Sequence, residues 1–464
     1  MKNLGKSKAG LTGPVADGEL ELLFAPLARY RLAVIAVSGG PDSMALMYLI
    51  SRWCRLHAAE LERGVLPRIE AVTIDHRLRP EGAREALWVG EQAAALGLNH
   101  RSLAWECERP ATAIQALARE ARYRLLAEVA GRMTPSAVLT AHTEDDQAET
   151  LIMRLGRGSG LDGLAAMAPL RPLSPAGGVD LVRPLLGVAK ARLCATLDAA
   201  CVPWLSDPSN DRSEFERVRV RQARDQLAQL GLTSERLALS ARRLRRAREA
   251  VDGLVRDFCR REVDVNAGVY ASLSRAAFAT SAEEVQVRVL ARLLAAFGGS
   301  SLAARLSQVE ALVGTLSKGG RVAATLGGCI VSAGERVMRV YREPAVARLA
   351  SIELVPGASA VWDGRFRVSV ARVSVSGEPD LRLVGRPGQI TVQPLGSAGY
   401  ATLLSERQVT RRVPARAAAS LPAFWSGGSL LSVPLLGVEA RLPDKLQPFG
   451  ACKTEFLGWE FASS

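Results

Sequence analysis

The chain has 464 residues, which is long enough for about three domains of roughly 150 residues each. Its 60 Lys and Arg outnumber its 47 Asp and Glu, and the formal net charge of +13 argues against an enzyme that handles only a small neutral metabolite. Such an excess of positive charge favours a polyanionic partner, most simply nucleic acid.

The cysteine pattern and the hydropathy exclude further classes. Seven cysteines are scattered along the chain without a CxxC pair, so we expect reduced thiols in a cytoplasmic protein, not disulfides, a zinc site or an iron–sulfur cluster. No run of about 18 uncharged apolar residues occurs, so we expect no membrane span. Residues 1–19 carry lysines but no apolar core, which predicts a flexible N-terminal tail and not a signal peptide.

Short apolar runs alternate with helical patterns between residues 20 and 225. Strands are predicted at 32–37, 69–74 and 137–141. Helices are predicted at 44–57, 81–97, 112–130 and 146–156. This alternation predicts an α/β fold with a parallel, doubly wound sheet, whose ligands bind at the carboxyl ends of the strands. Polar residues follow each strand at once, so we expect three polar clusters to converge on one crevice.

The remainder of the chain changes character twice. Helical periodicity dominates from about 215 to 315, and its arginine run has no interleaved acidic residues, which favours phosphate binding at least as much as a solvated helix face. A hairpin or small sheet is predicted at 322–341, and short strands and turns follow from 363. We therefore expect a catalytic domain at 20–225, a mainly helical domain at 226–345 and a small β or α+β domain at 363–464.

The first polar cluster joins a buried strand to a helix. It consists of Ser38, Gly39, Gly40, Pro41, Asp42 and Ser43. A helix N-terminus binds anions through its N–H groups, and the glycines let a phosphate approach closely. Asp42 would repel a polyphosphate unless a divalent cation such as Mg²⁺ lay between them. An ordinary glycine-rich turn is the alternative, and the complete six-residue order makes it the weaker one.

The second cluster follows the strand predicted at 69–74. It contains Thr73, His76 and Arg79. Main-chain groups of Thr73 are expected to read the edge of an adenine, with His76 or Arg79 over the ring or the phosphates. A polar loop without a ligand is an equal alternative.

The third cluster is acidic. Its carboxylates repel one another unless a cation lies among them, such as Mg²⁺ or the ammonium of an amine substrate. They are Glu144, Asp145, Asp146 and Glu149. His142 is a candidate general base, and a structural hydrogen bond is an equal alternative. Arg154 and Arg157 are expected to hold a transferring α-phosphate, with an acidic helix start followed by surface arginines as the alternative.

Taken together, these motifs resemble two nested families. The first cluster resembles the S-G-G-x-D-S loop of the N-type ATP pyrophosphatases, the PP-loop family, and lacks the Gly-Lys-Ser/Thr of a Walker motif. Several segments in the same order resemble the tRNA(Ile)-lysidine synthetases. They lie at 75–79, 114–123, 141–160 and 204–210. Arg77, Thr143 and Val218 depart from the glycine, histidine and asparagine that are common in that family, and Val218 leaves the contacts at its position unassigned.

The resemblance implies an ATP-dependent ligase. ATP would adenylate the oxygen on carbon 2 of the wobble cytidine in the CAU anticodon of tRNA(Ile), and free L-lysine would then displace AMP to form lysidine. The resemblance implies ATP and Mg²⁺, with Asp42 and Asp146 as metal ligands and catalytic residues beside His142. Lysine would bind at Asp145, Asp146 and Glu149, with Arg119 holding its carboxylate or a phosphate.

The basic residues outside this site are the expected tRNA contacts. They are Arg217, Arg221, Arg242, Arg243, Arg246 and Arg416. Phe424 and Trp425 are candidates for stacking on a base, with a place in the core of the C-terminal domain as the favoured alternative.

Two rival functions differ in class. Another PP-loop tRNA-modifying enzyme, such as a thiolase, is disfavoured because no CxxC pair occurs. A non-catalytic tRNA-binding protein is disfavoured because the loop and the acidic cluster are both complete. The sequence leaves the oligomeric state open, and a homodimer is compatible with it.

Overall fold

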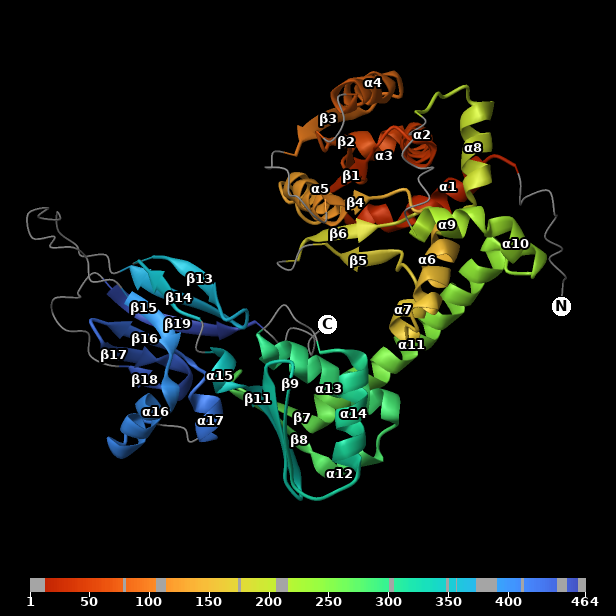
Figure 1. Cartoon of the computed structure of the whole chain (residues 1–464). Coiled ribbons are helices and arrows are strands. Elements are labelled where there is room, and N and C mark those ends of the chain that lie inside the picture. The colour runs from red at the N-terminus through yellow and green to blue at the C-terminus, as the bar shows by residue number, and fades with distance from the viewer. Residues whose placement is uncertain are drawn as a thin grey trace, which may run out of the picture. The chain divides into compact units, whose positions relative to one another are not determined.

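The computed structural model divides into two compact units, residues 1–248 and 249–464 (Figure 1). It describes residues 13–77, 81–105, 114–173, 177–205, 216–299, 304–347, 350–355, 357–372, 390–409, 413–439 and 449–457. Within these ranges, no helix is both long and apolar enough to cross a membrane.

The first unit is built on a six-stranded sheet in the order β3-β2-β1-β4-β6-β5. Its strands are β1 Leu32–Ala36, β2 Arg68–Asp75, β3 Asn99–Ala104, β4 Ser136–Leu139, β5 Leu170–Pro172 and β6 Val179–Val182. All neighbours pair in parallel except β5, which runs antiparallel to β6 at one edge. Ile35 of β1 lies beside Ala71 of β2 and Leu139 of β4, so these three strands end at the same edge of the sheet.

Helices cover both faces of this sheet. They are α1 Asp17–Phe24, α2 Pro41–Leu56, α3 Ala58–Glu62, α4 Gly82–Ala95, α5 Ile114–Ala130, α6 Glu144–Gly156, α7 Leu161–Leu164, α8 Lys190–Ala199, α9 Glu216–Gln222 and α10 Arg224–Gln229, with the 3₁₀ helix η2 Ala25–Arg29 and the start of α11 Ser234–Glu262. Ala33 and Ile35 belong to a core shared with α2 and α8, whereas Leu32 and Val34 belong to a second core with α5. Since successive residues of a strand face opposite sides, this division shows the predicted doubly wound sheet.

The N-terminal segment corrects the expectation of a flexible tail at 1–19. Val15 is buried, and α1 begins at Asp17. Arg192 of α8 donates to Glu19 at 2.7 Å and to the carbonyl of Gly13 at 3.0 Å. The described residues 13–19 are therefore part of the folded unit, held by the buried Val15 and by the salt bridge of Glu19. Two such contacts leave no repeating pattern in the sequence, so the sequence did not predict them.

The second unit begins with an antiparallel sheet in the order β7-β8-β11-β10-β9. Its strands are β7 Val263–Asn266, β8 Tyr270–Ser274, β9 Val322–Leu326, β10 Cys329–Ala333 and β11 Val337–Arg342. The helices α12 Arg275–Thr280, α13 Glu283–Gly298 and α14 Leu306–Ser317 accompany the sheet and share one hydrophobic core with it. The region expected to be mainly helical, 226–345, is thus mixed, and the predicted hairpin at 322–341 is three of its five strands.

Two further antiparallel sheets complete this unit. One has the order β12-β15-β16-β17-β18, and the other has the order β13-β14-β19. The strands are β12 Ile352–Leu354, β13 Ser359–Trp362, β14 Phe366–Arg372, β15 Ile390–Pro394, β16 Pro422–Ser426, β17 Ser429–Val433, β18 Val438–Glu439 and β19 Phe449–Phe456. The helices are α15 Pro344–Ala347, α16 Gly396–Ser405, α17 Ala415–Ala418 and the 3₁₀ helix η4 Pro434–Leu436. The expected domain start at 363 lies in the turn between β13 and β14, so the β structure begins before it.

Candidate active site

The loop between β1 and α2 has the geometry of an anion site. Gly40 is the N-cap of α2, and Pro41 is its first residue. Ser43 Oγ donates to the carbonyl of Gly40 at 2.9 Å and accepts from the N–H of Ser38 at 3.2 Å. These bonds fix the turn before any ligand arrives, with the first N–H groups of a 16-residue helix at its mouth.

The backbone conformation and the neighbours of position 39 favour glycine over any residue with a side chain. Its φ of +86° lies in the left-handed region, and a Cβ on it would come within 2.8 Å of Leu205 Cδ1. The N–H of Leu205 also donates to the carbonyl of Gly39 at 2.9 Å, so the segment ending at Leu205 packs directly on the loop. The rest of the family-like motif at 204–210 lies outside the described residues.

Asp42 carries one carboxylate oxygen that is paired and one that is not. Oδ2 accepts from Lys190 Nζ at 2.8 Å, whereas Oδ1 is buried without a hydrogen-bond partner among the described residues. Burial raises the pKa of Asp42, and the charge of Asp146 adds to that rise. The charge of Asp146 thus acts on the loop carboxylate, and the expected convergence of the two clusters on one crevice stays a prediction.

Lys190 is a site residue that the sequence analysis missed. Its ammonium binds Asp42, and its backbone N–H donates to Asp145 Oδ2 at 2.8 Å. It is the first residue of α8, which follows the strand β6. Because β6 has only four residues, no strand was predicted there, and the basic residue after it was not placed at the carboxyl edge.

The start of α6 orders the acidic cluster. Thr143 is the N-cap, and its N–H and hydroxyl donate to Asp146 Oδ2 at 2.8 and 3.1 Å. Asp145, Asp146 and Glu149 are all buried. The carboxylates are therefore held in fixed positions at the end of β4, where an acidic helix start is also favoured by the helix dipole.

Arginines of α9 supply the positive charge that this cluster requires. Arg217 Nε donates to Glu149 Oε2 at 2.7 Å, and its NH2 donates to Asp146 Oδ1 at 3.1 Å. Arg221 Nε donates to the other oxygen of Glu149 at 2.6 Å. The structure thus places Arg217 and Arg221, expected as tRNA contacts, against the acidic cluster.

Both carboxylate oxygens of Asp145 bind groups of the protein. Its Oδ2 binds the N–H of Lys190, and its Oδ1 accepts from Ser234 Oγ at 3.1 Å and pairs with Arg224 at 2.5 Å. Both oxygens of Asp145 therefore have partners within the protein, as do both oxygens of Asp146 and of Glu149. Binding of a free amine by these three carboxylates stays a prediction.

His142 is a neutral imidazole at physiological pH. Burial lowers its pKa to about 4, the charge of Asp146 opposes this shift, and the nearby arginines add to it. A 2.9 Å hydrogen bond joins its Nδ1 to Thr140 Oγ1. This geometry favours the structural alternative over a strong general base, because a base with a pKa near 4 holds a proton weakly at pH 7.

The structure describes two of the three residues that were expected to contact adenine or the phosphates. Thr73 is buried, and its hydroxyl bonds to His100 Nε2 at 2.9 Å, so only its main chain is left for a ligand. His76 packs edge-on against Trp105, and its Nδ1 is buried without a partner among the described residues. Arg79 lies outside the described residues.

The remaining predicted arginines are dispersed. Arg154 lies eight residues after Asp146 on α6, about 12 Å along the helix axis. Arg157 follows the helix and pairs with Glu216. Neither is brought to the PP-loop, so their expected role at the α-phosphate is not supported.

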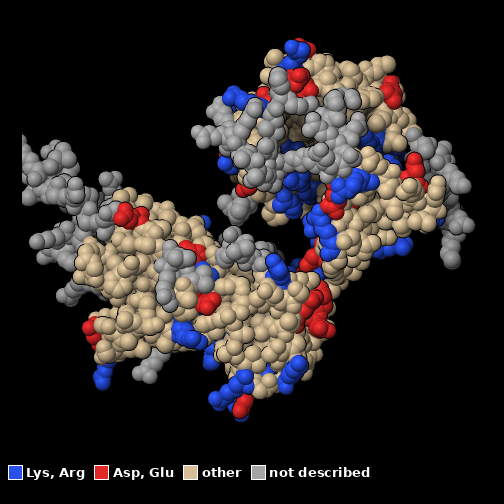
Figure 2. All heavy atoms as spheres, viewed as in Figure 1, with Lys and Arg blue, Asp and Glu red and all other residues tan. Residues whose placement is uncertain are grey.

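The other arginines that are expected to contact RNA are exposed. Arg242, Arg243 and Arg246 are exposed on α11, and Arg416 is exposed on α17 in the second unit. Figure 2 shows basic side chains gathered on the viewed face of the first unit. Phe424 is fully buried, which excludes it from stacking on a base, and Trp425 packs against the same core.

The candidate Mg²⁺ ligands are the carboxylates of Asp42 on the loop and Asp146 on α6. Among the described residues, no group of three or more His, Cys, Asp or Glu could hold a metal ion. Mg²⁺ commonly takes only one or two carboxylates together with phosphate oxygens and water. The unpartnered Oδ1 of Asp42 fits that pattern, and the charge of Asp146 acts on the same carboxylate.

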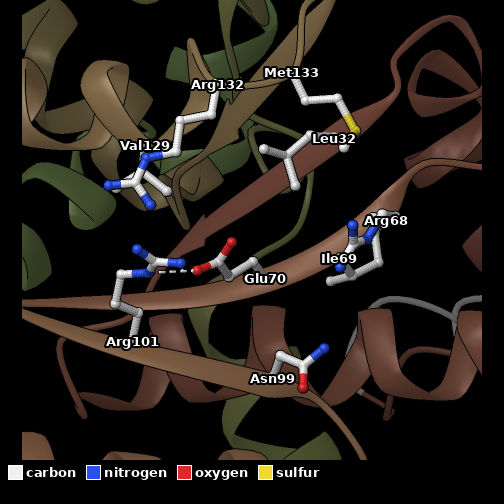
Figure 3. Close-up of a pocket in the computed structure, with 9 residues that line it drawn as sticks. All are labelled: Leu32, Arg68, Ile69, Glu70, Asn99, Arg101, Val129, Arg132 and Met133. Atoms are coloured by element: carbon white, nitrogen blue, oxygen red, sulfur yellow. Dashed lines mark hydrogen bonds and ion pairs between the residues drawn. The ribbon is translucent and has the colours of Figure 1, made fainter.

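A separate cavity of about 200 Å³ lies at the opposite, amino-terminal edge of the sheet (Figure 3). Its walls include Leu32, Arg68 and Asn99, which are the first residues of β1, β2 and β3. Arg132, which follows α5, also lines it. It is not part of the carboxyl-edge site.

The first unit matches a family of known proteins. A family model described as a PP-loop domain matches residues 15–226. Residues 15–226 of this chain therefore form a PP-loop domain, which implies the use of ATP.

Relatives define the family more closely. A tRNA(Ile)-lysidine synthase from Bradyrhizobium sp. (strain BTAi1) is 42% identical over 352 residues, covering 71% of this chain and 95% of that protein. Proteins of the same name from Bradyrhizobium diazoefficiens and Ruegeria pomeroyi are 47% and 38% identical, over 66% and 87% of this chain and 83% and 88% of theirs. This chain belongs to the tRNA(Ile)-lysidine synthase family, and it is a tRNA-modifying ligase.

Proposed function

We propose that this enzyme ligates free L-lysine to carbon 2 of the wobble cytidine in the CAU anticodon of tRNA(Ile), at the expense of ATP. The observation that carries the proposal is that Lys190 binds both Asp42 at the PP-loop, through its ammonium at 2.8 Å, and Asp145 of the acidic cluster, through its backbone N–H at 2.8 Å. A nucleotide held by the loop and an amine held by the acidic cluster would meet over the ends of β1 and β4.

The first half-reaction activates the base. The oxygen on carbon 2 of cytosine attacks the α-phosphorus of ATP, the bond between the α-phosphorus and the bridging oxygen breaks, and pyrophosphate leaves. The loop N–H groups and Lys190 stabilise the negative charge on the phosphates. Mg²⁺, when bound at Asp42 and Asp146, supplies further charge neutralisation.

The second half-reaction forms the new C–N bond. The ε-amine of lysine attacks carbon 2, the C–O bond to AMP breaks, and AMP carries away the electron pair. The amine must lose a proton in this step, and we assign Glu149 or Asp146, which pair with Arg217 in the free enzyme, as its acceptor. His142 supports this cluster as a neutral neighbour because its pKa is about 4.

Arg217 and Arg221 link the two half-reactions. They neutralise Asp146 and Glu149 in the free enzyme, and the charge of Arg221 also acts on Asp42. Phosphate groups of ATP and tRNA compete for these guanidinium groups, which frees the carboxylates for the lysine ammonium.

The RNA must present a single unstacked cytidine to this site. Recognition of RNA by protein usually targets loops whose bases can be splayed out. The exposed arginines of α11, together with Arg416, are expected to contact the tRNA backbone. The homodimer stays a prediction.

The test is transfer of labelled lysine. The protein is incubated with a tRNA(Ile) transcript that has a CAU anticodon, with ATP, Mg²⁺ and radiolabelled lysine. Label should enter the RNA only when ATP is present, and Asp42→Asn or Asp146→Asn should abolish it. A transcript with uridine at the wobble position is the matched control, and equal labelling of both transcripts would refute the assignment of the target base.

A further inference from the structure

A group of arginines surrounds one tyrosine next to the acidic cluster. Over the ring of Tyr123, on α5, the guanidinium carbons of Arg119, Arg122 and Arg171 lie 5.2, 5.3 and 5.8 Å from the centroid. Arg183 follows β6, hydrogen-bonds to Tyr123, and is acted on by the charges of Arg171 and Arg119. We call these five residues the arginine pocket.

The positive charge of the arginine pocket is not neutralised within the described part of the chain. None of its four arginines forms an ion pair with a described Asp or Glu. The Nε atoms of Arg122 and Arg183 are buried without a hydrogen-bond partner there, and only 5% of Arg183 is exposed. Burial lowers the pKa of both side chains, Tyr123 raises it in part, and the neighbouring arginines lower it further. Buried, unpaired donors of one sign indicate a missing anion.

The arginine pocket borders the site on the side of His142. In the sheet, β4 separates β6 and β5 from β1, which leads into the PP-loop. Arg171 is on β5 beside Leu181 of β6, and Arg183 comes directly after β6. The charges of Arg183 and Arg119 act on His142, which follows β4. Arg171 and Arg183 are therefore separated from the PP-loop strand by β4, whereas α5, which carries Arg119 and Arg122, packs against β1, β2 and β4, and the charge of Arg122 acts on His76.

Four guanidinium groups exceed what a small anion needs. The single carboxylate of a free amino acid would leave most of this charge unpaired, and the phosphates of ATP have their own site at the loop. An RNA strand supplies successive phosphates, and a tyrosine ring flanked by arginines can stack on a base.

We propose that the arginine pocket binds the RNA backbone phosphates next to the nucleotide presented to Asp146, which rests on the proposed function. These phosphates would position the anticodon strand so that its target base enters the candidate active site.

The test compares charge removal at the arginine pocket with charge removal elsewhere on the same unit. Arg119→Gln and Arg171→Gln change exposed side chains, so the double variant should fold. Arg132→Gln is the matched control, because Arg132 is an exposed arginine at the opposite edge of the sheet (Figure 3). Affinity for the tRNA transcript is measured by fluorescence anisotropy at several salt concentrations, and KM values for ATP and lysine are measured at saturating tRNA.

The double variant should bind tRNA about tenfold more weakly, and the slope of log Kd against log salt should fall by about 1 to 2. The control should stay within about twofold of wild type in tRNA affinity and in both KM values. A higher KM for lysine or for ATP with an unchanged salt slope would overturn the proposal, because the arginine pocket would then hold that substrate. If wild type neither binds the transcript nor transfers lysine, the proposed function itself fails.

Discussion

Lys190 forms an ion pair with Asp42, with 2.8 Å between Nζ and Oδ2, and so brings a positive charge to the mouth of the PP-loop. The same residue binds the acidic cluster through its backbone N–H. One residue at the start of α8 therefore joins the two halves of the site.

Replacing Lys190 by Met should weaken ATP use. The variant keeps the length and the backbone N–H of the residue but removes the ammonium beside Asp42, so charge on the phosphates is less stabilised. We expect the KM for ATP in tRNA-dependent pyrophosphate release to rise about tenfold, with a smaller change in the KM for lysine. Lys190→Arg should recover most of the loss, and a variant with unchanged ATP kinetics would exclude this role.

Gly39→Ala should disable the loop. The substitution places a Cβ at positive φ and against Leu205, which should cost about 1–3 kcal/mol of stability and abolish ligation. Gly40→Ala is the matched control, because Gly40 has a φ of −70° and its added Cβ would meet only Ser38 Oγ at 3.9 Å. Denaturant unfolding and lysine transfer measure both variants, and equal behaviour of the two would contradict the account.

His142 should make the first unit sensitive to mild acid. Its folded pKa of about 4 lies below the ordinary value of 6.5, so its stabilising effect is complete above pH 6.5 and is lost as the pH falls towards 4. Between pH 7 and pH 5 this loss should amount to about 1–2 kcal/mol. Urea unfolding of wild type and His142→Gln at both pH values tests it, and the variant should show a smaller loss. A loss of the same size in both would assign the acid sensitivity to other groups.

Asp363 should be essential to the second unit. Its oxygens bind Arg342 at 2.6 Å and Arg365 at 2.9 Å, and all three side chains are almost fully buried. Asp363→Asn leaves two buried cations without a counter-charge, which should destabilise this unit by about 3–5 kcal/mol. The exposed pair of Arg367 and Glu455 is the control, and Glu455→Gln should change stability by less than about 1 kcal/mol. Comparable losses in a thermal unfolding experiment would refute the distinction.

The sequence predicted the architecture where the periodicity is strong. β1, β2 and β4, together with α2, α4, α5 and α6, lie close to their predicted positions because each combines an apolar repeat with a clear turn. The short strands β5 and β6 were not predicted, since runs of three and four residues do not show a period. Missing β6 also meant missing Lys190 and Arg183.

The candidate site shows the same division. Motif order identified the loop at 38–43 and the acidic cluster, because the chemistry of both is local in the chain. The partners of the carboxylates come from distant segments, and Arg217 and Glu149 are 68 positions apart. The sequence indicated that a cation must lie among the carboxylates, but only the fold shows that arginines of α9 already lie there.

The most direct test of the shared site is the isolation of the adenylated RNA. Wild type is mixed with the tRNA transcript and ATP labelled at the α-phosphate, without lysine, and the RNA is then recovered and digested. The account predicts that label is attached to the wobble cytidine and that it leaves as AMP when unlabelled lysine is added. Label that never joins the RNA, or lysine that enters the RNA without ATP, would contradict it.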